Sequence, residues 1–475
     1  MPANGRARFR APFQDLPTDI LQPILSQLSD RKDWHSCMLV SKVFNRVATP
    51  FLYKTLDSRV ISKSLVHHPS TTLLRRPELA LYVRRVTETG AIHRGMIFRY
   101  PNITRDTLAA LALCTNLRSV TWIDDSSTTH TTLLAFLDVI RTLPVKELTI
   151  RTHSDLGETV WTQLITLTGL RKVSIWCMEG PPRVLQGWSG PLGSTLTHLE
   201  LGRCAGVPPT ILITVLSQLP LLKDLRLKGA PATSIPTILT FLPNLQSLDT
   251  EYLLSGSGSY YSRRPPRGEP DEPLVPILRN LTVRTSSMDY HGPQKLWTWI
   301  RELVPRPGLE SFRLHAFTFN MGYTGVPRMF ILELADAHGS TLRDFIVGEA
   351  HLTLNDIECL SSKFIKLETL VCSVASPDVA SIVDAISAAR NLQTLKLSVN
   401  WIPDDEAHKR IHFTLEDATR MMLRTEDSRL RTISIGHVQY TGKWILGEDD
   451  GTKENASDKL KFIVSADLAE DRWKT

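Results

Sequence analysis

The chain has 475 residues, of which 42% are hydrophobic and 22% are charged, a balance that excludes a disordered chain and allows one large core or two to three ordinary ones. The formal net charge of +6, from 55 basic and 49 acidic residues, is small for this length. It comes without a long Lys/Arg run and gives no support for nucleic acid binding, and no stretch is apolar for long enough to span a bilayer.

The first predicted elements are helices within residues 13–57, which follow a polar tail over residues 1–12. A second helical segment is predicted from Arg31 to Val47, with Ser29-Asp30 offering its cap and Pro50 ending it. Three short helices bury too little to fold alone, so this segment is either a docking module or a cap on the next domain. The first helix carries one apolar stripe at three- and four-residue steps: Ile20, Leu21, Ile24, Leu25 and Leu28.

This segment resembles an F-box in its Leu16-Pro17 opening, in the stripe just described and in the run Leu39-Val40-Ser41-Lys42. The tail Pro50–Leu56, PFLYKTL, is similar to the P-x-L-Y-x-x-L ending of fungal F-box proteins. In that family the module docks on a small Skp-type adaptor, which joins it to a cullin scaffold and a RING subunit. The resemblance implies an adaptor-binding set made of Leu16, Pro17, Ile20, Leu21, Ile24, Leu25, Leu28, Val40, Ser41 and Phe44.

For the apolar stripe, the free energy of burial gives a further reason to expect adaptor binding. A module this short cannot bury this stripe internally, and each fully buried Leu or Ile contributes about 1.5–3 kcal/mol. We therefore expect Leu21, Ile24, Leu25 and Leu28 to supply the apolar face that meets the adaptor.

From residue 83 onward a six-residue sequence pattern recurs, which we call the phrase. It consists of an apolar residue, two other residues, an apolar residue, one other residue and an apolar residue. The steps between copies are mostly about 23 to 33 residues, and helix-like runs such as 132–140 and 211–219 lie between copies. Repeated strand and helix predict an α/β fold with a parallel sheet. A degenerate first copy lies at 83–86. The clear copies are 117–122, 145–150, 170–175, 196–201, 222–227, 245–250, 278–283, 309–314, 342–347, 367–372, 392–397 and 430–435.

Residues 58–475 thus resemble a degenerate leucine-rich-repeat solenoid, with parallel strands on the inner face and helices outside. The Asn expected after each strand is largely missing. Residues 255–273 are rich in Ser, Gly, Pro and charge, which predicts a flexible insertion, either passive or a binding or phosphorylation loop. An exposed turn over 447–456 and a final strand over 459–464 are also predicted.

Period two in a strand sends the fourth and sixth residues of the phrase into the core, so the third, fifth and seventh face the open surface. Several residues predicted on this face are basic, including Lys396 in a later copy. The acidic residues Glu200, Asp249 and Glu251 lie among them and reduce the net positive charge. The face is either an ordinary solvated surface or a site for an acidic or phosphorylated target segment. The target-binding candidates are Arg226, Lys228, Arg284, Arg313 and His315.

The search for catalytic motifs finds no P-loop, HExxH or GxSxG pattern. His67-His68 and Asp124-Asp125 are interpreted as solvated loop and turn residues. The six cysteines lack metal or disulfide spacing, and Met1–Arg10 lacks the apolar core of a signal peptide.

We therefore expect a cytoplasmic or nuclear protein that is not an enzyme, with no cofactor, metal, nucleic acid or membrane partner. Two classes of function remain: the substrate-recognition subunit of an SCF-type cullin–RING ubiquitin ligase, or a repeat scaffold that is not coupled to a ligase. The target protein itself cannot be identified from exposed strand positions, which vary freely in repeat proteins.

Overall fold

The computed structural model describes residues 18–58, 68–95, 98, 100–125, 131–178, 185–252, 275–285, 293–316, 325–402, 413–446 and 460–468. Leu16, Pro17, the predicted insertion at 255–273 and the predicted turn at 447–456 lie outside these residues. The chain forms two compact units. The first comprises residues 1–181 with 190–196, and the second comprises 182–189 with 197–475.

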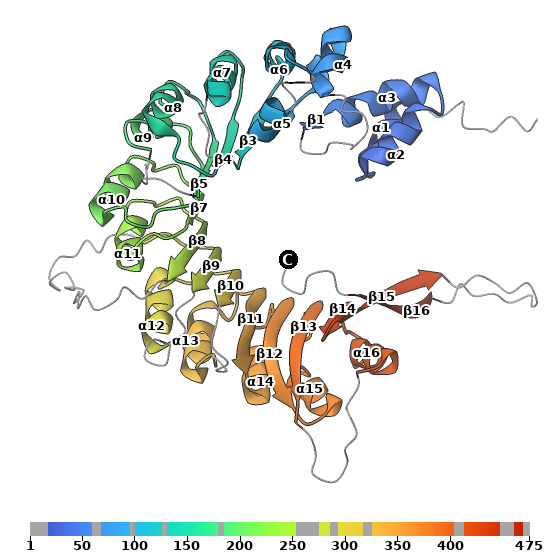
Figure 1. The fold of residues 1–475 in the computed structure, drawn as a ribbon. Coiled ribbons are helices and arrows are strands. Elements are labelled where there is room, and N and C mark those ends of the chain that lie inside the picture. The colour runs from blue at the N-terminus through green and yellow to red at the C-terminus, as the bar shows by residue number, and fades with distance from the viewer. Residues whose placement is uncertain are drawn as a thin grey trace, which may run out of the picture. The chain divides into compact units, whose positions relative to one another are not determined.

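The first unit contains a helical module followed by parallel strands that pair in chain order, with helices on one side of the strands (Figure 1). Its elements are α1 (Thr18–Ser26), α2 (Arg31–Met38), α3 (Lys42–Tyr53), β1 (Thr55–Asp57), α4 (Pro69–Arg75), the 3-10 helix η2 (Pro77–Tyr82), β2 (Arg85–Thr89), α5 (Gly90–Gly95), α6 (Ile103–Ala112), β3 (Ser119–Asp124), α7 (Thr131–Ile140), β4 (Glu147–Thr152), α8 (Gly157–Leu164) and β5 (Lys172–Cys177). The short helix α9 (Ser189–Leu192) lies between β5 and β6 along the chain.

The second unit repeats the same arrangement and ends in an antiparallel extension, β14–β15–β16. Strands β6 to β14 pair in parallel in chain order. Its elements are β6 (His198–Leu201), α10 (Pro209–Ser217), β7 (Asp224–Leu227), the 3-10 helix η3 (Ala232–Ser234), α11 (Ile235–Leu239), β8 (Ser247–Tyr252), β9 (Asn280–Thr285), α12 (Pro293–Leu303), β10 (Ser311–Ala316), α13 (Arg328–His338), β11 (Asp344–Leu352), α14 (Leu354–Lys363), β12 (Thr369–Ser376), α15 (Val379–Ala385), β13 (Thr394–Trp401), α16 (Leu415–Met422), β14 (Thr432–Ile435), β15 (Val438–Leu446) and β16 (Leu460–Leu468).

Every predicted copy of the apolar phrase coincides with a strand, and the α/β class with a mostly parallel sheet and helices is confirmed. In the copy at 117–122 the first, fourth and sixth residues, Leu117 just before β3 and Val120 and Trp122 within it, are buried. The alternation follows from the two-residue period of a strand with one covered face. The predicted helices at 132–140 and 211–219 are α7 and α10, and the predicted last strand is β16.

A shared backbone arrangement sets how consecutive strands begin. We call the residue immediately before each strand its pre-strand residue. The carbonyl of Lys54, before β1, accepts the N–H groups of Arg84 and Arg85 at 2.9 and 3.1 Å. The carbonyl of Arg84 accepts those of Arg118 and Ser119 at 2.9 and 3.0 Å. These paired bonds align the pre-strand residues of neighbouring strands in one row.

The helical module differs from the prediction in two respects. The predicted segment from Arg31 to Val47 is two helices, because Ser41 accepts a hydrogen bond from the N–H of Phe44 and starts α3. Pro50 does not end the helix but lies inside α3. The compact first unit comprises this module together with β1–β5.

No helix in the described part of the chain is both long and apolar enough to cross a membrane.

Candidate functional site

The helical module α1–α3 is held together by contacts around Trp34. Its indole nitrogen Nε1 donates to the carbonyl of Leu25 at 3.0 Å, and its ring stacks on Phe51 with centroids 6.1 Å apart. The side-chain amide of Asn45 donates to the carbonyl of Met38 at 3.1 Å, which ties the end of α2 to α3. The three helices therefore have a defined packing, with a small core inside the module.

That core contains residues that were expected on the surface. Leu21 and Leu25 are only 2% and 3% exposed, whereas Ile20 and Ile24 on the same helix are 49% and 51% exposed. Because α1 packs against α3, one side of the apolar stripe is covered by the chain itself. Of the stripe residues, Ile20 and Ile24 are therefore exposed, Leu21 and Leu25 lie in the core contrary to the expectation that they form an outer face, and Leu28 is half-buried.

A second exposed apolar group lies at the junction of α2 and α3. Leu39, Val40 and Val43 are 75%, 64% and 39% exposed. Ser41 in this junction is exposed while its hydroxyl caps α3, and Phe44 is half-buried. Large apolar groups exposed together on a small module are typical of a docking surface. We call Ile20, Ile24, Leu39, Val40 and Val43 the exposed apolar set.

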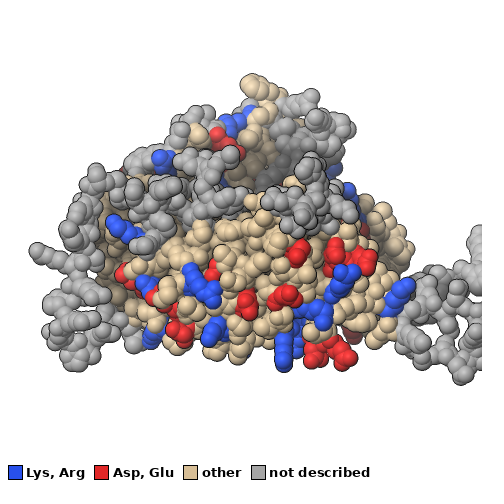
Figure 2. All heavy atoms as spheres, turned by 90° about the horizontal axis from the view of Figure 1, so that it is seen from below, with Lys and Arg blue, Asp and Glu red and all other residues tan. Residues whose placement is uncertain are grey.

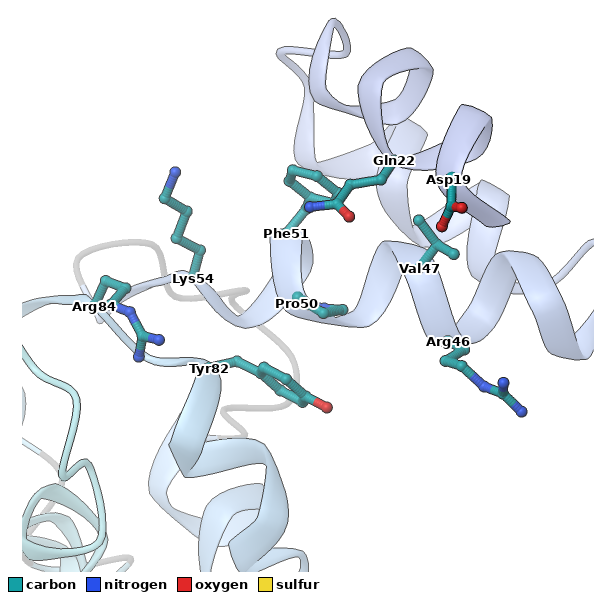
Figure 3. Close-up of a pocket in the computed structure, with 9 residues that line it drawn as sticks. All are labelled: Asp19, Gln22, Arg46, Val47, Pro50, Phe51, Lys54, Tyr82 and Arg84. Atoms are coloured by element: carbon teal, nitrogen blue, oxygen red, sulfur yellow. The ribbon is translucent and has the colours of Figure 1, made fainter. Parts of the chain in front are cut away.

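A groove lies where the module meets the segment before β2 (Figure 3). It has a volume of about 370 Å³. Its apolar wall comes from α3 and η2, while α1 contributes Asp19 and Gln22. Figure 3 shows Lys54 and Arg84 near the end of α3. The lining residues are Asp19, Gln22, Arg46, Val47, Pro50, Phe51, Lys54, Tyr82 and Arg84.

The predicted target-binding residues lie on strands β7, β9 and β10 or directly after β7, and the register places acidic residues between them. Glu200 on β6 pairs in register with Arg226, and Arg226 pairs with Asp249 on β8. In the neighbouring row, Glu251 is the Cα partner of Arg284, and Arg284 that of His315. Charges of both signs thus alternate along the face. Acidic and basic side chains are also mixed on the side of the molecule that Figure 2 shows.

Ion pairs neutralise much of this basic face. Arg284 forms a salt bridge with Asp249, and Arg226 with Asp224 at 3.3 Å. Burial lowers the pKa of His315, and the neighbouring Arg284 lowers it further, so the folded chain favours the neutral imidazole. The carboxylate of Glu251 accepts the backbone N–H of Gly229 at 2.6 Å. The charges of these residues are therefore partly compensated by their neighbours.

Two sequence interpretations are wrong in the first unit. His68 is not a solvated loop residue: it is 7% exposed, and its Nδ1 accepts the N–H of Ser70 and caps α4. That hydrogen bond places the proton of a neutral imidazole on Nε2, which lies 3.4 Å from Glu88 Oε2. Asp124 is not a solvated turn either, since its carboxylate is 3% exposed and accepts two hydrogen bonds from Arg94, both 2.8 Å long.

Glu88 is bracketed by a second imidazole, because His93 Nε2 lies 3.5 Å from the same Oε2 atom. Burial by itself raises the pKa of Glu88, but the close approach of the His68 and His93 imidazoles outweighs it and lowers the pKa to about 2. His93 also stacks on Trp122, with ring centroids 6.0 Å apart. Within the described ranges, no group of three or more His, Cys, Asp or Glu residues could hold a metal ion.

Sequence reasoning missed these buried partners because they lie far apart along the chain. His68 and Glu88 are joined by tertiary packing, and so are Arg94 and Asp124. It also missed the pre-strand residues of the first unit, although the second position of the phrase carried the signal. Aligning the copies at that position places Arg84, Arg118, Lys146 and Arg171 in one column.

Comparison with known proteins places the family resemblance at the start of the chain. Residues 13–87 match the COS11 F-box domain. The match covers the three helices and extends through η2 to the first residues of β2. The F-box is therefore supported by the residues of α1–α3 and by the family comparison, over less than a fifth of the chain. No curated protein matches the chain.

Two solved structures show distant similarity. One is the complex of Rad7 and Elc1 from yeast, with 14% identity, a TM-score of 0.42, and coverage of 83% of this chain and 94% of the other. The second is the complex of Toll and Spatzle from Drosophila, with 13% identity and a TM-score of 0.31. It covers 81% of this chain and 50% of the other.

Proposed function

We propose that the protein is the substrate-recognition subunit of an SCF-type cullin–RING ubiquitin ligase. The helices α1–α3 dock on a Skp-type adaptor, and the strands and helices that follow bind the target protein as a leucine-rich-repeat solenoid. The chain itself carries no chemistry: it acts by raising the effective concentration of target lysines near a ubiquitin-loaded partner.

The exposed apolar set is the observation that carries this proposal. Its five side chains are 39% to 75% exposed in a module that matches an F-box domain. Exposed apolar side chains gain free energy when a partner covers them, at about 25 cal/mol per Å² of apolar surface. Ile20 and Ile24 stand four residues apart on one face of α1, and Val40 and Val43 flank the start of α3.

Leu21 and Leu25 support the same surface from behind. Their side chains fill the core under α1, while Ile20 and Ile24 stay exposed because neighbouring residues point about 100° apart around a helix. The adaptor face that we propose therefore consists of the exposed apolar set and the exposed residue Ser41. Leu16, Pro17, Leu28 and Phe44 remain proposed members on the basis of the family resemblance.

Recognition of the target remains assigned to the open strand face of the second unit. Arg226, Lys228, Arg284, Arg313 and His315 are its candidate residues. The alternating charges of that face favour a partner with charges of both signs over a purely acidic one, because each bound anion must compete with Asp249 or Asp224.

Co-purification with a Skp-type adaptor tests the proposal. The double variant Ile24→Asp/Val40→Asp places charges on exposed positions, so it leaves the fold intact and abolishes adaptor binding. A matched variant, Ile211→Asp, changes an exposed apolar residue of α10 and keeps full binding. Equal adaptor recovery by the three proteins would refute docking through this surface.

The alternative is a repeat scaffold without a ligase. It predicts no adaptor binding by the wild-type protein. A ubiquitin-transfer assay distinguishes the ligase subunit and the scaffold from an enzyme. We expect the purified chain with E1, E2 and ubiquitin to give no product, and we expect transfer to require added adaptor, cullin and RING subunits. Transfer by the chain without those subunits would contradict the non-catalytic role.

A further inference from the structure

The pre-strand residues of the first unit form a row of like charges. In chain order they are Lys54, Arg84, Arg118, Lys146 and Arg171. Arg84 is half-buried and the other four are exposed. The backbone holds them in register: the carbonyl of Arg118 accepts the N–H groups of Lys146 and Glu147, and the carbonyl of Lys146 accepts those of Arg171 and Lys172, at 2.8 to 3.0 Å.

Like charges on adjacent strands repel one another, so a row of this kind is unfavourable unless something compensates it. Neighbouring parallel strands are about 4.7–4.9 Å apart, which keeps the five cations within reach of one extended ligand. Among the described residues, neither Lys54 nor Arg118 has an ion-pair partner. The guanidinium of Arg84 donates to the backbone carbonyls of Leu81 and Val83, which fixes its position without neutralising its charge.

The second unit provides an internal comparison, because its pre-strand residues occupy the same backbone position. There, acidic and neutral residues separate the cations, and salt bridges form along the row. Arg279 pairs with Glu310 at 3.4 Å, and Arg343 pairs with Glu368 at 3.0 Å. The full row is Thr197, Lys223, Gln246, Arg279, Glu310, Arg343, Glu368, Gln393 and Arg431. The strand geometry therefore does not require cations here, and the uniform charge in the first unit needs another explanation.

The groove of the helical module lies at the end of this row and shares Lys54 and Arg84 with it. Its walls include Val47, Pro50 and Phe51 of α3. Tyr82, which is 38% exposed, lines the groove from η2. Aliphatic and aromatic walls beside two cations suit an apolar side chain flanked by carboxylates.

We infer that the first unit binds an extended acidic segment of a partner protein along the row Lys54–Arg84–Arg118–Lys146–Arg171, with one apolar side chain in the groove. Side chains on one face of an extended peptide recur about every 6.6–6.8 Å, so about four carboxylates match the span of five cations. Arginine forks bind carboxylates in a bidentate manner. Asp19 on the groove wall repels the continuous negative charge of a nucleic acid, which favours a protein segment.

Peptide binding to the full-length protein tests this inference. The probe is a fluorescent 12-residue peptide in which Glu alternates with Ser and one end carries Leu. We expect the variant Arg118→Ala/Lys146→Ala to weaken binding about fivefold, and more strongly at low salt, as expected for exposed charge contacts. The matched control, Arg279→Ala/Arg343→Ala, removes two cations from the same backbone position in the second unit and leaves the affinity unchanged.

A second pair of measurements separates the groove from the row. We expect Tyr82→Ala to weaken binding of the peptide that carries Leu, and to leave unchanged the binding of an otherwise identical peptide that ends in Ser. If the two double variants weakened peptide binding equally, binding would depend on net charge alone. That result would refute a binding site along the row of the first unit. A single-stranded oligothymidine that binds more tightly than the peptide, with the same dependence on Arg118 and Lys146, would refute the assignment to a protein segment.

The inference is independent of adaptor docking, which we assign to the exposed apolar set. Adaptor co-purification is therefore measured in the same variants. Loss of peptide binding with intact adaptor binding is the expected result. Loss of both in Arg118→Ala/Lys146→Ala would contradict a separate surface.

Discussion

Trp34 and Leu25 are joined by a hydrogen bond of 3.0 Å from the indole Nε1 to the backbone carbonyl. The carbonyl belongs to the last turn of α1, and it also accepts the N–H of Leu28 at 3.2 Å. The bond therefore closes the end of α1 and fixes which side of the helix faces α3. Leu25 lies in the core for this reason, and Ile24 lies on the surface.

The first prediction concerns Leu25→Asp. The substitution removes a buried side chain and places an unpaired carboxylate in the core, so we expect it to unfold the helical module and to lose adaptor binding as a consequence. Hydrogen exchange of residues 18–53 measures this directly. Ile24→Asp is the matched control: protection in α1–α3 stays at the wild-type level while adaptor binding is lost. Full protection in Leu25→Asp would contradict the assignment of Leu25 to the core.

The second prediction concerns Gly90, at the start of α5. A Cβ atom at this position would collide with the carboxylate of Asp124, which holds Arg94. We expect Gly90→Ala to destabilise the first unit by about 1–3 kcal/mol, the usual cost of overpacking. Gly95→Ala is the control, because a Cβ there meets nothing within 4 Å. Chemical denaturation of both variants measures the difference, and equal stabilities would contradict the close packing of Gly90 on Asp124.

The third prediction concerns pH. The pKa of Glu88 is about 2 in the folded chain and 4.5 in its ordinary range. A carboxylate with a lowered pKa contributes stability that is complete above pH 4.5 and is lost as the pH falls toward 2. This contribution is at most about 3 kcal/mol. We expect Glu88→Gln to be destabilised at pH 7 and to show a weaker loss of stability between pH 4.5 and 2 than wild type.

Hydrogen exchange of residues 85–95 across this pH range measures the effect locally. Parallel pH profiles for wild type and Glu88→Gln would show that Glu88 does not titrate with a lowered pKa.

The fourth prediction concerns His315. Burial and then Arg284 lower the pKa of its imidazole, so the folded state favours the neutral form and loses stability as the pH falls below 6.5. Arg284→Ala removes a nearby cation and releases Asp249, and both changes raise the pKa of His315. Deuterium exchange at the imidazole C2 position, followed by mass spectrometry, measures it. Lys396→Ala is the control, and an unchanged His315 pKa in Arg284→Ala would refute the coupling.

The sequence predicts the strands well because each one repeats the same local signal. Leu117, Val120 and Trp122 show the spacing that every other copy shows, and one covered face explains it. The same periodicity could not decide between Ile24 and Leu25, because adjacent residues both belong to a broad apolar stripe. That choice depends on where α3 and Trp34 pack, which is tertiary information.

Partners that are distant in sequence account for most of the remaining errors. Arg94 and Asp124 meet because α5 and β3 are adjacent in the fold, and nothing near either residue indicates the other. His68 was interpreted from its neighbour Pro69, yet its role depends on Glu88. Charge balance on the strand face likewise requires the register, since Asp249 lies beside Arg284 only after residues of β8 and β9 are paired.

The most direct test of the account is titration of the purified full-length protein with a purified Skp-type adaptor in a calorimeter. We expect saturable one-to-one binding with a negative heat capacity change, because apolar surface on Ile20, Ile24 and Val40 is buried. Ile24→Asp/Val40→Asp should show no binding heat while its thermal unfolding matches that of the wild-type protein. Absence of binding by the wild-type protein, or undiminished binding by the double variant, would contradict docking through this surface.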